Sequence, residues 1–508
     1  MALHDFTFYD LINRNAVCYG KRPAWIDAED QRALSFADIK QQVDRLAAGL
    51  QKRGVQKGER IGVLGKNSLD YFLLYGAAAA VGAIILPINW RLSAEEVIFN
   101  LNDGTPKFLF ADPEYQSMIG SAKERLPSVQ RYFNLKPPGG VFDDFNDLLK
   151  SSAGFAPAEV SDEDGLVIIH TAAVAGRPRG ALLTHRNLIS ANTHLNLLMH
   201  LSPQDVHLNL LPLFHVGGLF MATMAFHAGA LNVNMSKFDA VQAVDLIAEK
   251  KVTVLFDFSP ILGSILDQQA KTGKEISSLR HVIGLEGAET IEKYQKQTGG
   301  TFYVMYGQTE TSAIATLGRY NDRPGSAGRT IPLADVKLVD ENERAVPAGQ
   351  VGEIAVKGPM VFSGYWNLPE DTAHTFRGGW HHTGDLARFD EDGFLFYAGR
   401  KPDKELIKPG GENVYPAEVE KAILEHPAVE MTVVFGVPDP KWKEGIKAVC
   451  TLKAGQKLAA KELITFVGER IASYKKPQQV EFVAEMPLLA NGSPDRAKVK
   501  EQFGGAQK

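Results

Sequence analysis

The sequence predicts an α/β protein with a large N-terminal domain of α/β sheets, a small β-rich subdomain and a small α+β C-terminal domain. Three observations predict this class. Short apolar runs alternate with helical patterns in the first part of the chain, two hairpin patterns follow from about residue 325, and short helices and strands alternate after residue 400. We therefore place the domains at 1–400, with the β-rich subdomain from about 325, and at 401–508.

The first part of the chain reads as helices between short buried strands. Residues 33–54 carry apolar side chains at helical spacing, and Gly54 is placed to end this helix. The apolar stretch 76–90 is too short to span a bilayer and predicts a buried helix that leads into a strand. Buried strands are predicted at 58–65, 107–112, 165–170, 205–212, 252–258 and 281–287. Strands separated by helices favour largely parallel sheets.

The pattern of predicted elements changes after about residue 325. Residues 335–358 have a turn-rich middle between alternating flanks, which predicts a hairpin, and 385–400 predict a second hairpin that turns at Asp390–Gly393. Behind residue 400 the patterns predict a helix, two strands and a helix, at 417–427, 428–439, 447–453 and 461–472.

Composition excludes several classes of protein. The chain has 508 residues, of which 44% are hydrophobic and 23% are charged, as in globular proteins. Its net charge of −5 argues against general nucleic-acid binding, which needs a basic surface. The two cysteines, Cys18 and Cys450, have no metal or disulfide spacing, so a reducing compartment is expected. We see no secretory signal and no membrane-spanning segment, and we expect a cytoplasmic protein.

The segment HTAAVAGRPRG, residues 170–180, resembles a phosphate loop that has lost its hydroxyls. Gly176 and Gly180 allow close backbone approach to an anion, and Arg177 and Arg179 supply positive charge. The P-loop pattern is not met, because no Lys-Ser or Lys-Thr pair follows the second glycine. Taken alone, the segment is equally an ordinary solvated turn.

Further motifs follow this loop in a specific order. Together with it, they resemble the adenylate-forming (ANL) superfamily over nearly the whole chain. The motifs are LPLFHVGG at 211–218, YGQTETS at 306–312, GSAGR at 325–329, WHHTGDLARFD at 380–390, and YAGRKPDKELIKPGGENVYPAEVE at 397–420. The last motif looks most like the branch that makes acyl-CoA thioesters. The resemblance implies an AMP-forming acyl-CoA synthetase that uses Mg²⁺, ATP, CoA and a carboxylic acid, and a mobile C-terminal domain.

The resemblance implies a nucleotide site in which each residue has a chemical reason. Glu310 is an oxygen ligand suited to Mg²⁺, Thr309 can bond a phosphate oxygen, and the Tyr306 ring can stack on a base. Asp385 would accept hydrogen bonds from both ribose hydroxyls, and Arg400 would close the same site. The expected nucleotide-binding residues are Thr171, Gly176, Arg177, Gly180, Gly287, Ala288, Tyr306, Gly307, Thr309, Asp385 and Arg400. The expected catalytic residues are Thr309, Glu310, Arg179 and His215.

An acyl pocket is expected beside the nucleotide. His215 corresponds to an aromatic gate with Gly217 and Gly218 behind it, although a lone histidine on an apolar stretch is also typical of a core. Glu286 falls at the pocket wall, where it would shorten the pocket or contact a polar group of the acid. The alternative is a strand-end glutamate paired with a nearby cation.

The resemblance also implies a tunnel for CoA and a hinge. Gly410 and Gly411 resemble the loop that lines the pantetheine tunnel, where glycine lets backbones and a narrow ligand pass closely. The expected hinge position is Pro402. Because proline fixes φ, Asp403 and Lys404 remain open as pivots.

Two departures from the family pattern bear on activity. The loop has A-A-V-A where relatives carry hydroxyls, which removes hydrogen bonds worth about 0.5–1.5 kcal/mol each. Ser493 occupies the position of the lysine that contacts the acyl carboxylate and α-phosphate, and the loss of such a charge costs about 10²–10³ in rate. Nearby cations are Arg496, Lys498 and Lys500.

Three functions therefore remain open at this point. We favour an acyl-CoA synthetase of a divergent branch. The alternatives are a nucleotide- or acyl-adenylate-binding protein with weak adenylation, which Ser493 favours, and an enzyme that loads a carrier protein. Medium-chain, cyclic and aromatic acids all remain possible substrates, Glu286 pointing to a compact or polar acid. A homodimer is an open alternative to a monomer.

Overall fold

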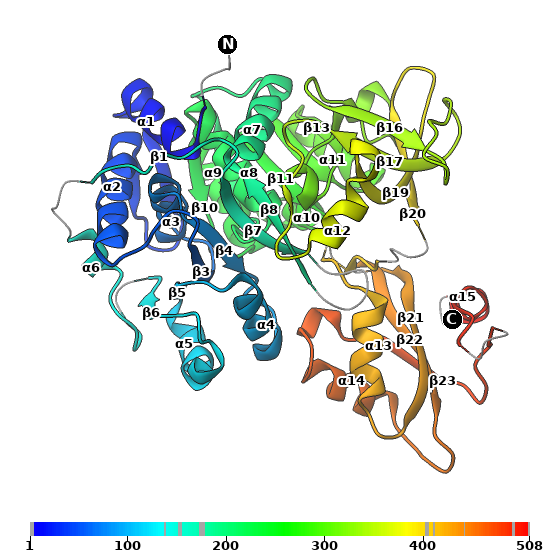
Figure 1. Cartoon of the computed structure of the whole chain (residues 1–508). Helices are drawn as coiled ribbons and strands as arrows, with labels where there is room; N and C mark the ends of the chain where they lie inside the picture. Colours follow the sequence, from blue (N-terminus) through cyan, green and yellow to red (C-terminus); the bar gives the residue numbers. More distant parts are fainter. Residues whose placement is uncertain are drawn as a thin grey trace.

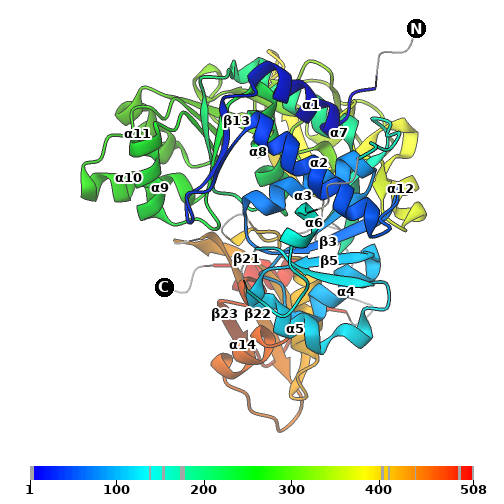
Figure 2. The ribbon, with the colours of Figure 1, turned by 90° about the vertical axis from the view of Figure 1, so that its left-hand side faces the viewer.

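The computed structural model describes residues 5–136, 139–150, 155–171, 178–401, 406–409, 412–440, 442–489 and 493–505. Two large sheets with their helices form the N-terminal body (Figure 1). The C-terminal region, coloured orange to red, lies beneath this body in both views (Figures 1 and 2). The predicted α/β class with a small C-terminal α+β region is confirmed.

The larger sheet has nine strands among the described residues. Their order is β15 (Arg329–Thr330), β14 (Thr316–Arg319), β13 (Thr301–Tyr306), β12 (His281–Leu285), β11 (Val254–Phe258), β9 (Val206–Asn209), β10 (Leu231–Asn234), β1 (Pro23–Asp27) and β2 (Ala33–Ser35). The pairs from β13 to β1 are parallel. Because the carboxyl ends of parallel strands meet at one edge, the segments after β11, β12 and β13 lie side by side there.

The second sheet has seven strands in the part of the chain that the structure describes. Their order is β18 (Gly364–Tyr365), β8 (Arg179–Thr184), β7 (Gly165–Thr171), β4 (Ile84–Ile88), β3 (Arg60–Leu64), β5 (Phe108–Ala111) and β6 (Arg131–Asn134). The predicted stretch 76–90 is the end of helix α3 (Leu69–Val81) followed by β4. Gly82 ends α3 at φ +70°, a conformation that glycine adopts without strain.

Helices cover these sheets and carry the core. The N-terminal body contains α1 (Phe8–Tyr19), α2 (Phe36–Lys52), α3, α4 (Ala94–Gly104), α5 (Pro113–Ser121), α6 (Asn146–Leu149), α7 (His185–Met199), α8 (Val216–Ala228), α9 (Ala240–Lys250), α10 (Ile261–Thr272) and α11 (Ala288–Thr298). The helix predicted at 33–54 is α2, with a Ser35–Asp38 capping box at its start. Helices α3 and α8 are buried along their whole length or nearly so, which explains why neither shows a polar face.

A four-stranded antiparallel sheet follows, again counting described residues. It orders β16 (Asp335–Val339), β17 (Gly352–Lys357), β19 (His381–Phe389) and β20 (Leu395–Arg400), with α12 (Pro369–Thr375) before β19. Both predicted hairpins are present, as β16–β17 and β19–β20. The second turns at Asp390–Gly393, where the Gly393 N–H donates to the Asp390 carbonyl.

The C-terminal region has its own small core and docks on the body through buried charges. It comprises α13 (Pro416–Leu424), β21 (Val429–Asp439), β22 (Lys443–Leu452), α14 (Ala460–Gly468), β23 (Gln479–Phe482) and α15 (Arg496–Phe503). Lys475 donates to Glu96 of α4 at 2.5 Å and to Glu418 of α13 at 2.6 Å. Arg91 of the body pairs with Glu412 at 2.6 Å. These contacts, called the docking cluster below, join the two parts in this orientation.

Candidate active site

A cavity of about 1080 Å³ lies where the carboxyl ends of the parallel strands meet the C-terminal region. Strands β11, β12 and β13 contribute Phe258, Leu285 and Tyr306 at or near their last positions. The C-terminal region contributes wall residues from four segments: Leu406, Lys408, Asn413, Tyr415, Val433, Phe435, Glu444, Arg496, Ala497 and Lys500. Ligands of open α/β sheets bind at this kind of edge.

Asp385 is the centre of a buried hydrogen-bond network on one wall of the cavity. The residue is buried, and its carboxylate accepts from the Tyr306 hydroxyl at 2.7 Å and from Gln308 Nε2 at 2.6 Å. Its other oxygen, Oδ1, lies 2.8 Å from Arg400 Nε and 3.3 Å from the Tyr397 hydroxyl. The Tyr306 and Tyr397 rings stack at 6.4 Å between centroids. Strands β13, β19 and β20 thus present one carboxylate, ringed by donors, to the cavity.

A second polar group surrounds Glu310 and Arg179. The Tyr365 hydroxyl donates to Glu310 Oε1 at 2.8 Å, and the Arg179 guanidinium lies over the Tyr365 ring at 4.0 Å. Arg179 also donates to Asp371 at 3.2 Å. Burial and the nearby Glu310 raise the pKa of Tyr365, which keeps this hydroxyl a donor. Thr309, next to Glu310, lies in a short 3₁₀ turn over 309–311 and lines the cavity.

His215 is a cavity residue and a helix cap. It precedes α8, and its Nδ1 accepts the Gly217 N–H at 3.1 Å. Burial lowers the pKa of His215, which keeps the ring neutral and Nδ1 able to accept. Gly217 lines the cavity, whereas Gly218 packs against the Pro212 carbonyl, 2.2 Å from where a Cβ would lie. The two glycines therefore differ in position.

The part of the cavity beside His215 is apolar and aromatic. Phe258 meets His215 edge to face at 6.3 Å and Phe256 at 5.0 Å. Further apolar wall residues are Val216, Ile291, Val304, Met305 and Ala313. Glu286 lines the same cavity, and its Oε1 accepts the Gly287 N–H at 2.6 Å.

The C-terminal region brings positive charge to the cavity. Lys408 faces the cavity, and the protein around its ammonium together with Arg400 lowers its pKa to about 8. Arg496 lines the cavity while it donates to the Val434 carbonyl at 2.8 Å, and Lys500 lies one turn further along α15. Ser493 is exposed and is not among the cavity-lining residues that the structure describes.

Most expected site residues converge, and several do not. Thr171, Arg179, His215, Gly217, Glu286, Ala288, Tyr306, Gly307, Thr309, Glu310, Asp385 and Arg400 all line the cavity. Among the described residues, Gly180, Gly218, Gly287 and Ser493 do not. Gly180 instead packs beneath Ile168 and Trp366. The remaining expectations lie outside the described residues: Gly176, Arg177, Pro402, Asp403, Lys404, Gly410 and Gly411.

Sequence reasoning missed several polar residues of this cavity. Gln308 lies inside the YGQTETS motif, so the motif could have indicated that it belongs to the site beside Asp385. Tyr397 begins the YAGR motif, which could have indicated its role in the same way. Tyr365 belongs to a two-residue strand with no periodic pattern, and only the pairing of β18 with β8 brings it to Arg179.

Comparison with known proteins shows the family. A model of AMP-binding enzymes matches residues 12–366, and a model of the AMP-binding enzyme C-terminal domain matches residues 418–493. The chain therefore belongs to the AMP-binding enzyme family.

Its relatives have different named substrates. A feruloyl-CoA synthase from Amycolatopsis is 33% identical over 93% of this chain and 94% of its own length. An indoleacetate–CoA ligase from Aromatoleum aromaticum is 34% identical over 93% of each chain. A solved structure from Rhodopseudomonas palustris, proposed to be a long-chain-fatty-acid CoA ligase, is 44% identical with a TM-score of 0.75, covering 78% of this chain and 100% of that one.

Proposed function

We propose that the protein is an AMP-forming acid–CoA ligase that activates a carboxylic acid with ATP and transfers the acyl group to CoA. The observation that carries the proposal is the meeting of three features in one cavity: the Asp385 network, the Glu310–Arg179 group and the aromatic compartment around His215. Membership of the AMP-binding family and relatives named as CoA ligases support it.

The nucleotide would lie against the Asp385 network. A carboxylate has about four acceptor sites, and four donors already contact Asp385, so the two ribose hydroxyls would replace donors such as Gln308 and Tyr397. Arg400, paired with Asp385, would hold that carboxylate in place and close the site over the ribose. Tyr306 already donates its hydroxyl to Asp385, so its role is to orient the carboxylate while its ring contacts the base.

Mg²⁺ would enter as the MgATP substrate. No group of three or more His, Cys, Asp or Glu side chains suited to a metal occurs in the described part of the chain. Glu310 stands instead as a cavity carboxylate within reach of the cationic Arg179. That donor set fits Mg²⁺, which usually takes one or two carboxylates and completes its shell with phosphates and water. Arg179 and Thr309 would hold phosphate oxygens.

The reaction would run in two steps with the same acyl group. A carboxylate oxygen of the acid attacks the α-phosphorus, the bond to the β-phosphate oxygen breaks, and pyrophosphate leaves. The CoA thiolate then attacks the acyl carbon, the carbon–oxygen bond to phosphate breaks, and AMP leaves. Fixed donors and cations supply positioning and charge neutralisation in both steps.

The C-terminal region would serve both steps by changing orientation. We propose that the part of residues 401–508 that follows the hinge turns about one of Pro402, Asp403 or Lys404, and that Gly410 and Gly411 line the path of CoA. In the present orientation Lys408, Arg496 and Lys500 face the cavity while Ser493 does not, which supports an assignment of this orientation to the second step.

The acid is best taken to be compact and apolar or aromatic. The walls contributed by Phe256, Phe258 and His215 offer ring edges and faces to such a group. Relatives named for ferulate and indoleacetate support an aryl acid. Glu286 would contact a polar substituent of the acid or limit its length.

The first experiment is acid-dependent ATP–pyrophosphate exchange with Mg²⁺, without CoA, over aryl, cyclic and medium-chain acids. Exchange with an acid, followed by thioester formation when CoA is added, supports the proposal. Exchange whose product is released only to a phosphopantetheinyl protein would replace it with carrier loading. ATP binding without exchange or thioester formation for any acid would leave a nucleotide-binding protein, the reading that Ser493 favours.

A further inference from the structure

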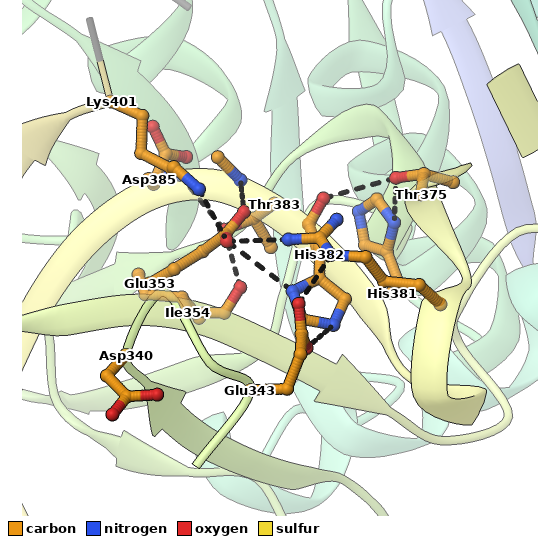
Figure 3. A network of polar contacts seen from close by, with 12 residues as sticks. Asp340, Glu343, Glu353, Ile354, Thr375, His381, His382, Thr383, Asp385 and Lys401 are labelled. Atoms are coloured by element: carbon orange, nitrogen blue, oxygen red, sulfur yellow. Dashed lines mark hydrogen bonds and ion pairs between the residues drawn. The ribbon is translucent and has the colours of Figure 1, made fainter. Parts of the chain in front are cut away.

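Glu353 contacts the chain segments that carry the Asp385 network (Figure 3). It lies on β17, is 6% exposed, and does not belong to the cavity wall as described. Its Oε1 accepts the Gly384 N–H at 3.0 Å. Its Oε2 accepts from Arg377 at 2.8 Å and from Lys401 Nζ at 3.1 Å. One buried carboxylate thus joins three points that are separate in the sequence.

The contacts with Gly384 and Lys401 close a ring. The Lys401 N–H donates to the Gly384 carbonyl at 3.0 Å, so both backbone groups of Gly384 are bonded within the ring. Gly384 has φ +71°, a left-handed conformation that favours glycine and turns the chain just before Asp385. Lys401 directly follows Arg400. The ring therefore fixes the backbone next to both members of the Asp385–Arg400 pair, whose charged atoms are 2.8 Å apart.

We propose that Glu353 is a positioning residue for the nucleotide, acting through Gly384 and Lys401 to hold Asp385 and Arg400 at the separation that receives a ribose. The inference rests on the proposed function, because it takes Asp385 to bind the ribose hydroxyls. It adds a residue outside the cavity to the set that determines nucleotide affinity. Lys401 directly precedes Pro402, the first of the expected hinge positions, so the ring would anchor the body side of the proposed hinge.

The ring depends on the negative charge of Glu353 as well as on the shape of its side chain. Two cations, Arg377 and Lys401, converge on its Oε2. Although burial alone would raise it, the contacts with His382, Lys401 and Arg377 lower the pKa of Glu353 to about 2, so the carboxylate stays ionised. An amide at this position could still accept the Gly384 N–H but would leave Lys401 without its anion.

A matched control lies beside it. Glu343 also accepts from Arg377, at 2.6 Å, and lies 2.9 Å from His382 Nε2, but it is more exposed, and the described carboxylate contacts of Gly384 and Lys401 go to Glu353 instead. Figure 3 shows that Glu343 and Glu353 both contact the His382 ring. Glu343→Gln therefore disturbs the same arginine and histidine without opening the ring.

The test compares AMP with 2′,3′-dideoxy-AMP by calorimetric titration of the full chain. If Asp385 reads the ribose, the unaltered protein binds AMP more tightly, and Glu353→Gln lowers that preference by about 10-fold, the size expected for weakened hydrogen bonds to a charged group. Binding of the dideoxy compound changes little, and Glu343→Gln keeps the preference. A folded Glu353→Gln protein with an unchanged preference overturns the inference while the proposed function stands.

Two further outcomes separate the ring from its neighbours. Lys401→Met breaks the ring from its other side, and the double variant with Glu353→Gln should lose no more preference than either change alone. Additive losses would mean that Lys401 contacts the nucleotide independently of Glu353, which overturns the ring as the cause. An unaltered protein that binds both nucleotides equally would remove the ribose role of Asp385, and the inference would fall with that part of the proposed function.

Discussion

Asp385 and Arg400 face each other across neighbouring strands β19 and β20, with 2.8 Å between Oδ1 and Nε. The register of the hairpin aligns these two residues directly, so the ion pair follows from the pairing of the strands. The side chain of Arg400 is 20% exposed and that of Asp385 is 4% exposed. The pair is thus partly screened from water and close to the cavity, where a charge acts strongly.

Removal of the Asp385 charge should weaken adenylation specifically. Asp385→Asn keeps the shape of the side chain but removes the ionic partner of Arg400, so we expect kcat/KM for ATP in pyrophosphate exchange to fall by about 100-fold. The control is Asp392→Asn, in the exposed turn of the same hairpin, where the side chain is 63% exposed. Equal losses in the two variants would contradict a nucleotide role for Asp385.

Replacement of Ser493 by lysine should accelerate the first step. Ser493 lies in a turn where its carbonyl accepts the Leu489 N–H at 2.8 Å, outside the cavity in this orientation. If the C-terminal region turns to bring this position to the α-phosphate, Ser493→Lys adds a charge there and raises the exchange rate by about 10- to 100-fold. Ser493→Ala serves as the control. An unchanged or lower rate would show that another donor has replaced this lysine.

Loosening of the docking cluster should affect the second step more than the first. Glu96→Gln removes one of the two carboxylates around Lys475, whose side chain is only 5% exposed. We expect thioester formation from supplied acyl-adenylate to fall by about 10-fold, while pyrophosphate exchange holds, because the cluster joins the two parts in this orientation. Glu95→Gln, on the same helix but 69% exposed and paired with Arg125, is the matched control. Parallel losses in both steps would contradict a role confined to this orientation.

The two glycines after His215 should respond differently to alanine. A Cβ at Gly217 would lie 2.9 Å from the Phe256 ring edge, so Gly217→Ala should fold and shift the preferred acids toward smaller ones. At Gly218 it would lie 2.2 Å from the Pro212 carbonyl, which cannot move without the backbone. Gly218→Ala should therefore lower the melting temperature. An acid profile unchanged in Gly217→Ala would place the acyl group elsewhere.

Buried histidine should make the protein less stable in mild acid. His185 is fully buried, its Nδ1 accepts the Phe8 N–H at 3.2 Å, and burial lowers its pKa to about 4. Below pH 6.5 the unfolded chain binds a proton that the folded chain does not, so the free energy of unfolding falls as the pH drops from 6.5 towards 4. One such residue accounts for about 2 kcal/mol between pH 7 and pH 5.

Denaturant unfolding at these two pH values measures the effect. His185→Asn offers an amide oxygen to the Phe8 N–H and does not titrate, so it should show a smaller difference between pH 7 and pH 5. A pH dependence identical to that of the unaltered protein would mean that other groups dominate, with His207, whose pKa burial also lowers to about 4, as the next residue to replace.

Much of the fold could be predicted because its patterns are local. Periodicity and the glycine at position 54 predicted α2 to within three residues at each end, and the turn at Asp390–Gly393 predicted the β19–β20 hairpin. The helix α15 was not predicted, because its apolar pattern is weak and only Val499 is buried along it. No described helix is both long and apolar enough to cross a bilayer.

Some residues of the candidate site could also be predicted from local motifs, and others could not. Motifs identified Asp385, Glu310, Tyr306 and Arg400, because each lies in a short block whose residues act together. They could not separate Gly217 from Gly218, since the difference depends on which backbone packs behind each glycine. Nor could they find Glu353, whose partners lie 24, 31 and 48 positions away along the chain.

The sequence by itself determined the fold class, the family and the residues at the carboxyl ends of the strands, because these depend on periodicity and on contiguous motifs. Only the tertiary structure decided which of those residues share a cavity, which cations the C-terminal region presents to it, and what stands behind Asp385. The physical reason is that buried charge must be satisfied by whichever partners the folded chain brings within hydrogen-bond distance. The sequence alone does not indicate which residues become such partners, because they are far apart along the chain.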